Sequence, residues 1–376
     1  MPWSTRDTMS LREEFITLAS QEGANRRELC RRFGISPQTG YKWLARFAQN
    51  GLSGLADASR RPLHSPGTTQ EPLQQAVLAL RREHPAWGGR KIARRLQDLG
   101  QSSLASSTVH SILRRHGLIT AQASADAQPW QRFEHEHPNA MWQIDFKGYV
   151  DTAGGRCHPL TLLDDHSRFN MAIRACARQE GATVREQLIE VFQTYGLPVR
   201  INADNGAPWG SPREPGQIST LALWLIRLGI RVSFSRPYHP QTNGKEERFH
   251  RSLKAEVLNG RSFTDLAQAQ AAFDRWRHVY NHQRPHQALG MQTPASRYRM
   301  SERSYPQSLP QIEYGPEDTV VVVKALGEMR FQGKRYKLSS ALRGMPVALR
   351  PIHGEDGRYK VYFMHHKLCE INLRQH

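Results

Sequence analysis

The sequence predicts a multidomain α/β chain with a helical N-terminal part, a core built on a mixed sheet, and a small all-β C-terminal domain. Apolar residues recur at helical spacing up to about residue 117, whereas strand-type alternation begins at residue 141. Strands and helices then alternate as far as residue 281, and short strands separated by glycine-containing turns follow from Thr319 to Leu373. A chain of 376 residues is long enough for two to four such domains.

Residues 1–50 predict a helix-turn-helix domain. Ser10 is the expected cap of the first helix, and Ser36 is the expected cap of a third helix that has Pro37 at its first position. A short helix, a glycine turn and a helix with polar side chains is the outline of a DNA-binding motif, although a small three-helix bundle without that role has the same pattern. The expected DNA contacts of this domain are Gln38, Thr39, Lys42 and Arg46.

A second helical DNA-binding domain is expected at residues 71–119, between linkers at 51–70 and 120–138. The first linker is rich in Gly, Pro and Ser, and its two adjacent arginines suit phosphates or a minor groove. Arginine doublets in the second domain suit a DNA backbone, although a single doublet is more often a solvated face. The candidates in the linker and this domain are Arg60, Arg61, Arg94, Arg95, Arg114 and Arg115.

The charge balance favours a polyanionic partner. Lys and Arg number 52 against 34 acidic residues, which gives a net charge of +18. No apolar run approaches the ~20 residues of a spanning helix, and the N-terminus does not resemble a signal peptide. The four cysteines form no CxxC pair, which argues against a zinc knuckle or a disulfide framework and suits a reducing cytoplasm. Nucleic acid is the expected partner.

The core is expected at residues 139–300, followed by a proline-containing linker and a small β-barrel at 319–376. The order of elements in the core is three strands, then helix, strand, helix, strand and helix. That order predicts an α/β sheet with antiparallel hairpins at one edge.

Two aspartates of this core stand where a metal site is expected. Asp145 lies inside an apolar strand, where a charge is costly unless a cation or partner neutralises it; a solvent-facing edge residue is the alternative. Asp204 follows the apolar strand 199–203, at the strand end where open α/β sheets place their sites; a plain Asp-Asn-Gly turn is the alternative. Carboxylates from distant parts of a chain suit Mg²⁺ or Mn²⁺.

Glu246 and Glu247 compete to be the third carboxylate. On a helix, Glu246 shares a face with Phe249 and Leu253, which is the side turned to the core. Glu247 aligns instead with basic residues, as expected for a metal ligand that points at DNA. We therefore predict Glu247, with Glu246 at a position where an aliphatic residue is expected; the pattern alone does not decide between them.

These residues carry a resemblance to a known family. Asp145, Asp204 and Glu247, with Ser-Arg-Pro-Tyr-His-Pro-Gln-Thr-Asn-Gly-Lys-x-Glu-Arg-Phe-His around the last, resemble the catalytic core of DDE-type bacterial insertion-sequence transposases, which is similar to that of retroviral integrases. The segments from Trp43 to Pro62 and from Tyr280 to Leu289 resemble the flanking parts of those transposases. The likeness spans nearly the whole chain.

The resemblance implies an RNase H-like fold and two Mg²⁺ ions, with Mn²⁺ as an alternative, held by the three acids. It also implies hydrolysis at the ends of a mobile element and joining of the 3′-hydroxyl ends to target DNA, with a dimer or tetramer assembled on double-stranded DNA. Arg251 and Lys254 match helix positions whose basic residues contact terminal DNA, and Asn243, a further expected DNA contact, matches the flexible loop before the glutamate. Asp165 matches a motif on the adjoining hairpin and is expected to be a supporting or structural residue, with a metal ligand as the alternative.

One spacing departs from the family pattern. Asp204 and Glu247 are 247 − 204 = 43 positions apart, against about 35 residues in many relatives, and the surplus fits a surface loop at 210–216. Two other functions compete with the transposase. One is a domesticated or inactive transposase that acts as a sequence-specific DNA-binding regulator, and the other is an RNase H-like nuclease that cuts RNA or branched DNA.

Overall fold

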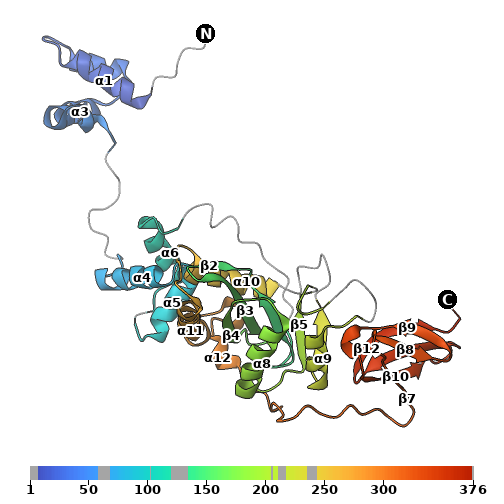
Figure 1. The fold of residues 1–376 in the computed structure, drawn as a ribbon. Helices are drawn as coiled ribbons and strands as arrows, with labels where there is room; N and C mark the ends of the chain where they lie inside the picture. The colour runs from blue at the N-terminus through green and yellow to red at the C-terminus, as the bar shows by residue number, and fades with distance from the viewer. Residues whose placement is uncertain are drawn as a thin grey trace. The chain divides into compact units, whose positions relative to one another are not determined.

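The computed structural model consists of two compact units, residues 1–69 and residues 70–376 (Figure 1). The residues that it describes are 7–57, 68–101, 103–119, 134–204, 206–210, 217–234 and 244–374. Within these ranges no helix is both long and apolar enough to cross a membrane. Arg60, Arg61 and Asn243, together with residues 211–216 of the expected loop, lie outside the described residues.

The first unit is a three-helix group. Helices α1 (Thr8–Ala19), α2 (Arg26–Arg32) and α3 (Pro37–Asn50) surround a small apolar core. The predicted cap of α3 is confirmed, because Ser36 Oγ accepts a hydrogen bond from the Thr39 N–H at 3.2 Å. The predicted cap of α1 is wrong: Ser10 lies inside α1, which begins at Thr8 after the extended residue Asp7.

A short 3-10 turn, Gly51–Leu55, extends this unit beyond α3. Leu55 is fully buried in the apolar core, and its carbonyl accepts a hydrogen bond from Arg12 Nη1 at 2.8 Å. Gly54 permits this approach, since a Cβ there would lie 2.3 Å from the carbonyl oxygen of Arg46. The packed part of the unit therefore continues into the start of the segment expected to be a linker.

The second unit begins with helices α4 (Glu71–Glu83), α5 (Gly89–Asp98) and α6 (Ser106–Arg115). Their apolar core contains Trp87 and Ile92, and Val279 of helix α11 (Leu266–His282) packs against it. Figure 1 shows α5 beside α11. The second helical group is thus packed on the α/β core.

The central sheet is mixed, as the sequence predicted. Its strand order is β2-β3-β1-β5-β6, with β4 on the remaining side of β3. The pairs β1–β3 and β3–β4 are antiparallel, whereas β1–β5 and β5–β6 are parallel. The strands are β1 (Trp142–Phe146), β2 (Val150–Thr152), β3 (Gly155–Asp164), β4 (Asn170–Cys176), β5 (Arg200–Ala203) and β6 (Arg231–Phe234).

Helices cover both faces of this sheet. One apolar cluster joins Trp142 of β1 to Leu188 of α8 (Gly181–Tyr195) and Trp224 of α9 (Thr220–Arg227). The other joins Leu163 and Ile173 to α10 (Gly244–Leu253) and α11. Helix α10 continues into a π-helical turn, Lys254–Leu258, and α11 is followed by a 3-10 turn, Gln287–Leu289, and α12 (Pro294–Arg297).

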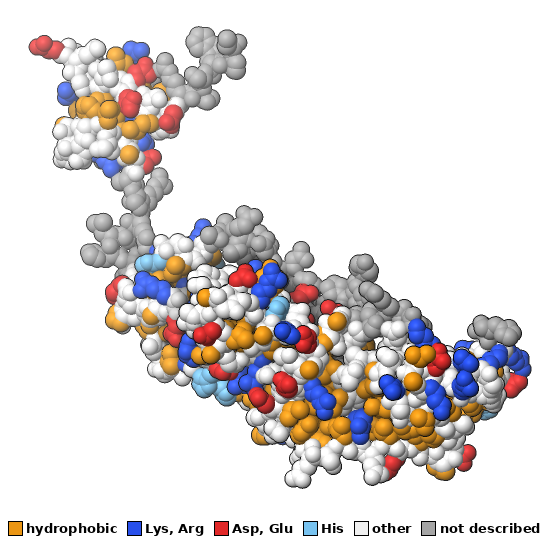
Figure 2. Space-filling model, viewed as in Figure 1, with side chains coloured by type: hydrophobic (Ala, Val, Ile, Leu, Met, Phe, Trp, Pro, Cys, Tyr) orange, Lys and Arg blue, Asp and Glu red, His pale blue; other side chains and the backbone are white. Residues whose placement is uncertain are grey.

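The C-terminal domain consists of a four-stranded sheet, β12-β11-β10-β7, and a two-stranded sheet, β8-β9, around one apolar core. Its elements are β7 (Thr319–Val322), β8 (Glu328–Phe331), β9 (Lys334–Lys337), a 3-10 turn (Ser340–Leu342), β10 (Pro346–Pro351), β11 (Arg358–Phe363) and β12 (His366–Asn372). On the visible face of the second unit, basic and hydrophobic side chains are intermixed (Figure 2).

Helix α9 belongs to two cores at once. Leu221 and Trp224 face the central sheet, whereas Ala222 and Ile226 lie in the core of the C-terminal domain. Ser339 Oγ also donates a hydrogen bond to the carbonyl of Ile218, just before α9, at 2.8 Å. The C-terminal domain is therefore docked on the α/β core.

We expect Ile226→Ala to lower the free energy of unfolding by about 2–4 kcal/mol, because it leaves a cavity where α9 enters the C-terminal domain. Urea denaturation of the full-length protein measures this change. Val322→Ala is the control: its side chain is half exposed, and the expected loss is below about 0.5 kcal/mol. Equal effects of the two changes would contradict the shared core.

Candidate active site

Asp145 and Asp204 lie side by side at the ends of two neighbouring strands. Strands β1 and β5 are parallel, and Gln143 pairs with Asn202. Asp145 and Asp204 each stand two positions further along, so the register places them opposite one another at the same edge of the sheet. Adjacent strands are about 4.8 Å apart, which brings the two carboxylates within strong electrostatic range.

The surroundings of Asp145 disfavour the ionised form of its carboxyl group. Burial and the charge of Asp204 raise its pKa to about 6, although Asp145 Oδ1 also accepts a hydrogen bond from the Phe146 N–H at 2.7 Å. A cation beside Asp145 would relieve this cost of ionisation. The donor set thus fits a divalent metal, and carboxylate oxygens are the ligands that Mg²⁺ and Mn²⁺ prefer.

Next to Asp145 lies a buried polar cluster that the sequence analysis missed. Its centre is the hydroxyl of Thr161, which is paired with Asp145 across β1 and β3. Thr161 Oγ1 lies 3.0 Å from Glu246 Oε1, 3.1 Å from the Asp145 carbonyl and 2.8 Å from His250 Nε2. The hydroxyl carries one hydrogen, so it cannot donate to both oxygens at the same time.

The Glu246 carboxyl is buried in this cluster. Burial and the nearby charge of Asp145 raise its pKa well above the ordinary range. Thr161 Oγ1 donates a hydrogen bond to Glu246 Oε1, which favours the charged form and partly offsets the effect of burial. Helix α10 therefore turns Glu246 toward the core with Phe249 and Leu253, as the helical face predicted.

His250 closes the cluster from the next turn of α10. Its Nδ1 lies 3.9 Å from Asp145 Oδ2, and burial together with Lys147 lowers its pKa to about 3. The ring is therefore neutral at physiological pH and adds no positive charge beside Asp145. The available sequence signal was its spacing, since His250 lies three and four residues after the two glutamates.

Glu247 lies on the exposed face of α10, together with Arg251 and, in the following π-helical turn, Lys254. The side chain is not turned into the interior. Within the described residues, no three His, Cys, Asp or Glu side chains converge closely enough to hold a metal ion. A metal site formed by Asp145, Asp204 and Glu247 therefore stays a prediction.

Asp165 has a supporting position. Its Oδ1 accepts a hydrogen bond from Gln143 Nε2 at 3.0 Å, and its Oδ2 accepts one from the His135 N–H at 3.0 Å. Lys245 Nζ lies 2.5 Å from the same Oδ2. The carboxylate thus joins β1 to the first turn of α10.

The expected DNA contacts of the first unit lie on α3. Gln38 and Lys42 are exposed, and Arg46 is partly exposed. The Thr39 hydroxyl lies 2.9 Å from Ser36 Oγ, so it takes part in the helix cap. Trp43 has cationic groups over its ring from Lys42, Arg46 and Arg12, at 5.1, 5.2 and 4.0 Å from the centroid. Such contacts hold the basic side chains close to the helix surface.

The arginine doublets of the second unit differ in their surroundings. Arg94 Nε pairs with Asp98 Oδ1 at 2.7 Å, and Arg95 Nη2 donates to Gln283 Oε1 at 3.2 Å. Arg95 therefore contacts the residue that follows α11. Arg114 and Arg115 are exposed at the end of α6.

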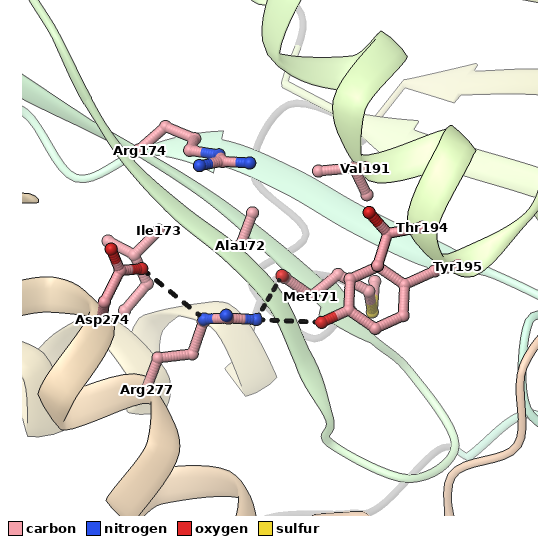
Figure 3. Close-up of a pocket in the computed structure, with 9 residues that line it drawn as sticks. All are labelled: Met171, Ala172, Ile173, Arg174, Val191, Thr194, Tyr195, Asp274 and Arg277. Atoms are coloured by element: carbon pink, nitrogen blue, oxygen red, sulfur yellow. Dashed lines mark hydrogen bonds and ion pairs between the residues drawn. The ribbon is translucent and has the colours of Figure 1, made fainter.

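A small cavity of about 90 Å³ lies between β4, α8 and α11 (Figure 3). Arg277 donates to the Met171 carbonyl at 2.7 Å and to the Tyr195 hydroxyl at 3.0 Å. Arg174 pairs with Glu190 at 2.8 Å. Neither Asp145 nor its partners line this cavity, and both of its arginines already have partners, so it is separate from the candidate active site.

Comparisons with known families agree with this architecture. Residues 135–240 and 228–294 match two families described as integrase core domains. Residues 11–62 match a helix-turn-helix domain, and residues 39–113 match a homeodomain-like domain. Residues 318–376 match the C-terminal domain of IS481 family transposases.

Related proteins include insertion-element products. A 31.7 kDa protein of the element IS407 from Burkholderia multivorans is 26% identical over 64% of this chain and 87% of its own length. A 39.2 kDa protein of IS476 from Xanthomonas euvesicatoria is 28% identical over 65% of this chain and 69% of its own. The Pro-Pol polyprotein of simian foamy virus type 3 is 31% identical over 38% of this chain, but over only 12% of the polyprotein.

Two solved structures are distant neighbours. One is a simian T-cell lymphotropic virus intasome in complex with the regulatory subunit B56 gamma of PP2A, with a TM-score of 0.39, 14% identity, and coverage of 76% of this chain and 91% of the other. The other is the catalytic core of HTLV-2 integrase in complex with magnesium, with a TM-score of 0.33, 14% identity, and coverage of 44% and 100%.

The fold and the matched domains define a DNA-binding protein with an integrase core, the domain of enzymes that cut and join DNA. More particularly, the chain is a relative of the bacterial insertion-sequence transposases, and its C-terminal domain is of the IS481 type. The resemblance inferred from the sequence motifs is confirmed at this level, as is the RNase H-like mixed α/β fold class.

We expect Asp145→Asn to stabilise the metal-free protein at neutral pH. The folded-state pKa of about 6 lies above the ordinary value of 3.8, so ionisation costs the folded state stability. This cost is absent below about pH 4, grows between about pH 4 and 6, and is complete above that range. Because 37% of the side chain is exposed, we discount the gain to about 1 kcal/mol.

Urea denaturation in the presence of a chelator, at about pH 4 and about pH 7.5, measures the difference between wild type and variant. Asp151→Asn is the control, since Asp151 is 81% exposed. A stability gap for Asp145→Asn that does not widen as pH rises would contradict the electrostatic account of this site.

Proposed function

We propose that this protein is a transposase that binds the terminal inverted repeats of its own mobile element. It hydrolyses the DNA at the element's ends and joins the resulting 3′-hydroxyl ends to target DNA. The observation that carries the proposal is the juxtaposition of Asp145 and Asp204 at the ends of adjacent parallel strands, inside an integrase core.

Asp145, Asp204 and Glu247 are the proposed holders of two divalent ions, Mg²⁺ or Mn²⁺. The raised pKa of Asp145 supports this role, because the carboxyl group is placed where its negative charge lacks compensation from the protein. When bound, such ions polarise a phosphate and stabilise the leaving oxygen. Glu247 is favoured over Glu246 because it lies on the exposed face of α10, whereas Glu246 is buried.

The protein's own side chains bind and orient the DNA. Arg251 and Lys254 lie four and seven positions after Glu247 and are exposed, so they are placed to hold phosphates close to the carboxylates. His250 stays neutral and therefore leaves the negative charge of Asp145 available. Positioning and electrostatic stabilisation are the expected sources of catalysis.

Recognition of the element's ends is assigned to the two helical DNA-binding groups, which imply a bipartite site. Exposed Gln38 and Lys42 on α3 are placed for the first part of that site, and Arg114 and Arg115 of α6 for the second. Joining two DNA ends in one event requires a dimer or tetramer on DNA. A role on the bacterial chromosome follows from these partners.

We expect Asp145→Asn, Asp204→Asn and Glu247→Gln each to reduce cleavage of DNA carrying the element's ends by at least about 100-fold. Binding to the same DNA should change little, because the helical groups carry the recognition. A gel-based cleavage and strand-transfer assay in Mg²⁺ or Mn²⁺, with a parallel binding measurement, tests this; the inverted repeats flanking the gene supply the DNA.

Glu246→Gln is the matched control on α10, since it keeps the size of the side chain and is expected to cut more than Glu247→Gln does. If Glu246→Gln does not cleave DNA and Glu247→Gln does, the third carboxylate is Glu246 and not Glu247. A wild-type protein that binds the ends but never cuts or joins them would instead be a DNA-binding regulator.

We expect Lys42→Ala to weaken binding to the element's ends and to reduce the slope of log affinity against log salt by about one, as for one lost phosphate contact. Fluorescence anisotropy between about 50 and 200 mM salt measures the slope. A slope equal to that of the wild type would show that Lys42 does not contact a DNA phosphate.

A further inference from the structure

We infer that Lys245 and Glu246, together with Asp165 and Thr161, form a two-point clamp that fixes the rotation of α10 and so positions Glu247 at the Asp145 end of the sheet. The inference rests on the proposed function and adds four positioning residues to it. None of these four needs to touch DNA or metal in order to act.

The first point of the clamp is an ion pair. Lys245 Nζ lies 2.5 Å from Asp165 Oδ2 and 3.3 Å from the Asp165 carbonyl. The Asp165 side chain is only 3% exposed, and its other oxygen is bonded to Gln143, two residues before Asp145 on β1. The first turn of α10 is thus tied to the strand that carries Asp145.

The second point is the hydrogen bond between Thr161 and Glu246, at 3.0 Å. Thr161 is the direct partner of Asp145 across the two strands, and its hydroxyl lies 3.1 Å from the Asp145 carbonyl. His250 reaches the same hydroxyl from the next turn of α10, at 2.8 Å. This tie also connects α10 to the backbone of Asp145.

Two ties on consecutive residues determine the angle of a helix about its axis. Each residue of an α-helix is rotated by about 100° from the one before, so the side chains of Lys245 and Glu246 project from the helix axis in different directions. With both directions fixed, that of Glu247 follows. The apolar packing of Phe249 and Leu253 holds α10 against the sheet, and the two ties add directional contacts to that packing.

The chemistry of the clamp favours a geometric role over a stabilising one. The Glu246 side chain is buried and the Lys245 side chain is only 18% exposed, so both groups lose free energy of solvation where they are. Apolar side chains at these positions would pack at lower cost. Polar groups give what apolar contacts do not, namely directional bonds of defined length.

The test compares Thr161→Val and Lys245→Met with the wild type in the full-length protein. The measurements are single-turnover cleavage at saturating DNA, DNA-end affinity, the melting temperature, and the affinity of the DNA-free protein for Mn²⁺ by electron paramagnetic resonance. We expect cleavage to fall about 10–100-fold and Mn²⁺ to bind about tenfold more weakly, as is typical when partners of metal ligands are lost. DNA affinity should stay within about twofold.

Thr161→Ser is the conservative variant, and it should keep cleavage and Mn²⁺ affinity within about threefold because it retains the hydroxyl. Thr194→Val is the matched control: its hydroxyl donates to the Glu190 carbonyl in α8 at 2.9 Å, so the same chemical change leaves the clamp intact. Should Thr161→Val not fold, the double variant Thr161→Val with Glu246→Leu replaces both partners by apolar groups and should fold but cut slowly.

The inference is overturned if folded Thr161→Val and Lys245→Met cut DNA and bind Mn²⁺ as the wild type does, or if Thr161→Ser is as impaired as Thr161→Val. It is also overturned if the loss of cleavage merely follows the loss of melting temperature across all variants, Thr194→Val included. A wild-type protein that neither cuts nor binds Mn²⁺ would overturn the proposed function itself. The two failures are therefore distinguishable.

Discussion

The cost of holding a negative charge on Asp145 is the constraint around which the candidate active site is built. Parallel pairing of β1 and β5 brings Asp145 and Asp204 to the same edge of the sheet, where burial and the charge of Asp204 raise the cost of ionising Asp145. A protein selected for stability alone would separate them. Their position at the carboxyl ends of adjacent strands suits a site where a bound cation neutralises them. The topology of the sheet is thereby linked to the chemistry proposed for it.

Helix α10 carries the two glutamates that compete to be the third carboxylate of this site. It buries Glu246 at a position where an aliphatic side chain is expected, and it exposes Glu247 on the side of Arg251 and Lys254. The buried carboxyl is tolerated because the Thr161 hydroxyl donates a hydrogen bond to it, and His250 contacts the same hydroxyl. Buried polar groups of this kind contribute directionality more than free energy, which suits a helix whose outer face must present one carboxylate at a defined angle.

The second helical group and the C-terminal domain are parts of the same packed unit as the integrase core. Helix α9 presents one side to the central sheet and the other to the C-terminal strands, and α5 contacts the end of α11 through Arg95. Consequently some basic residues that suit a DNA backbone also serve as contacts within the protein. Positive charge in the sequence identified the class of partner, but it did not separate the arginines that stabilise the protein from those that remain exposed.

The sequence by itself determined the order of elements, the mixed sheet, the cap at Ser36 and the family, because periodicity, capping residues and motifs are local signals. It also predicted Asp145 and Asp204 as site residues, since each ends or interrupts an apolar strand. Only the tertiary structure showed that these two residues stand in register, that Thr161 and His250 lie next to Asp145, and that α9 is shared by two cores. Those facts depend on strand pairing and on the rotation of α10, which are set by contacts between residues tens of positions apart. The cap predicted at Ser10 was wrong because Asp7 and Ser10 both precede helical sequence, and α1 begins at Thr8, directly after Asp7.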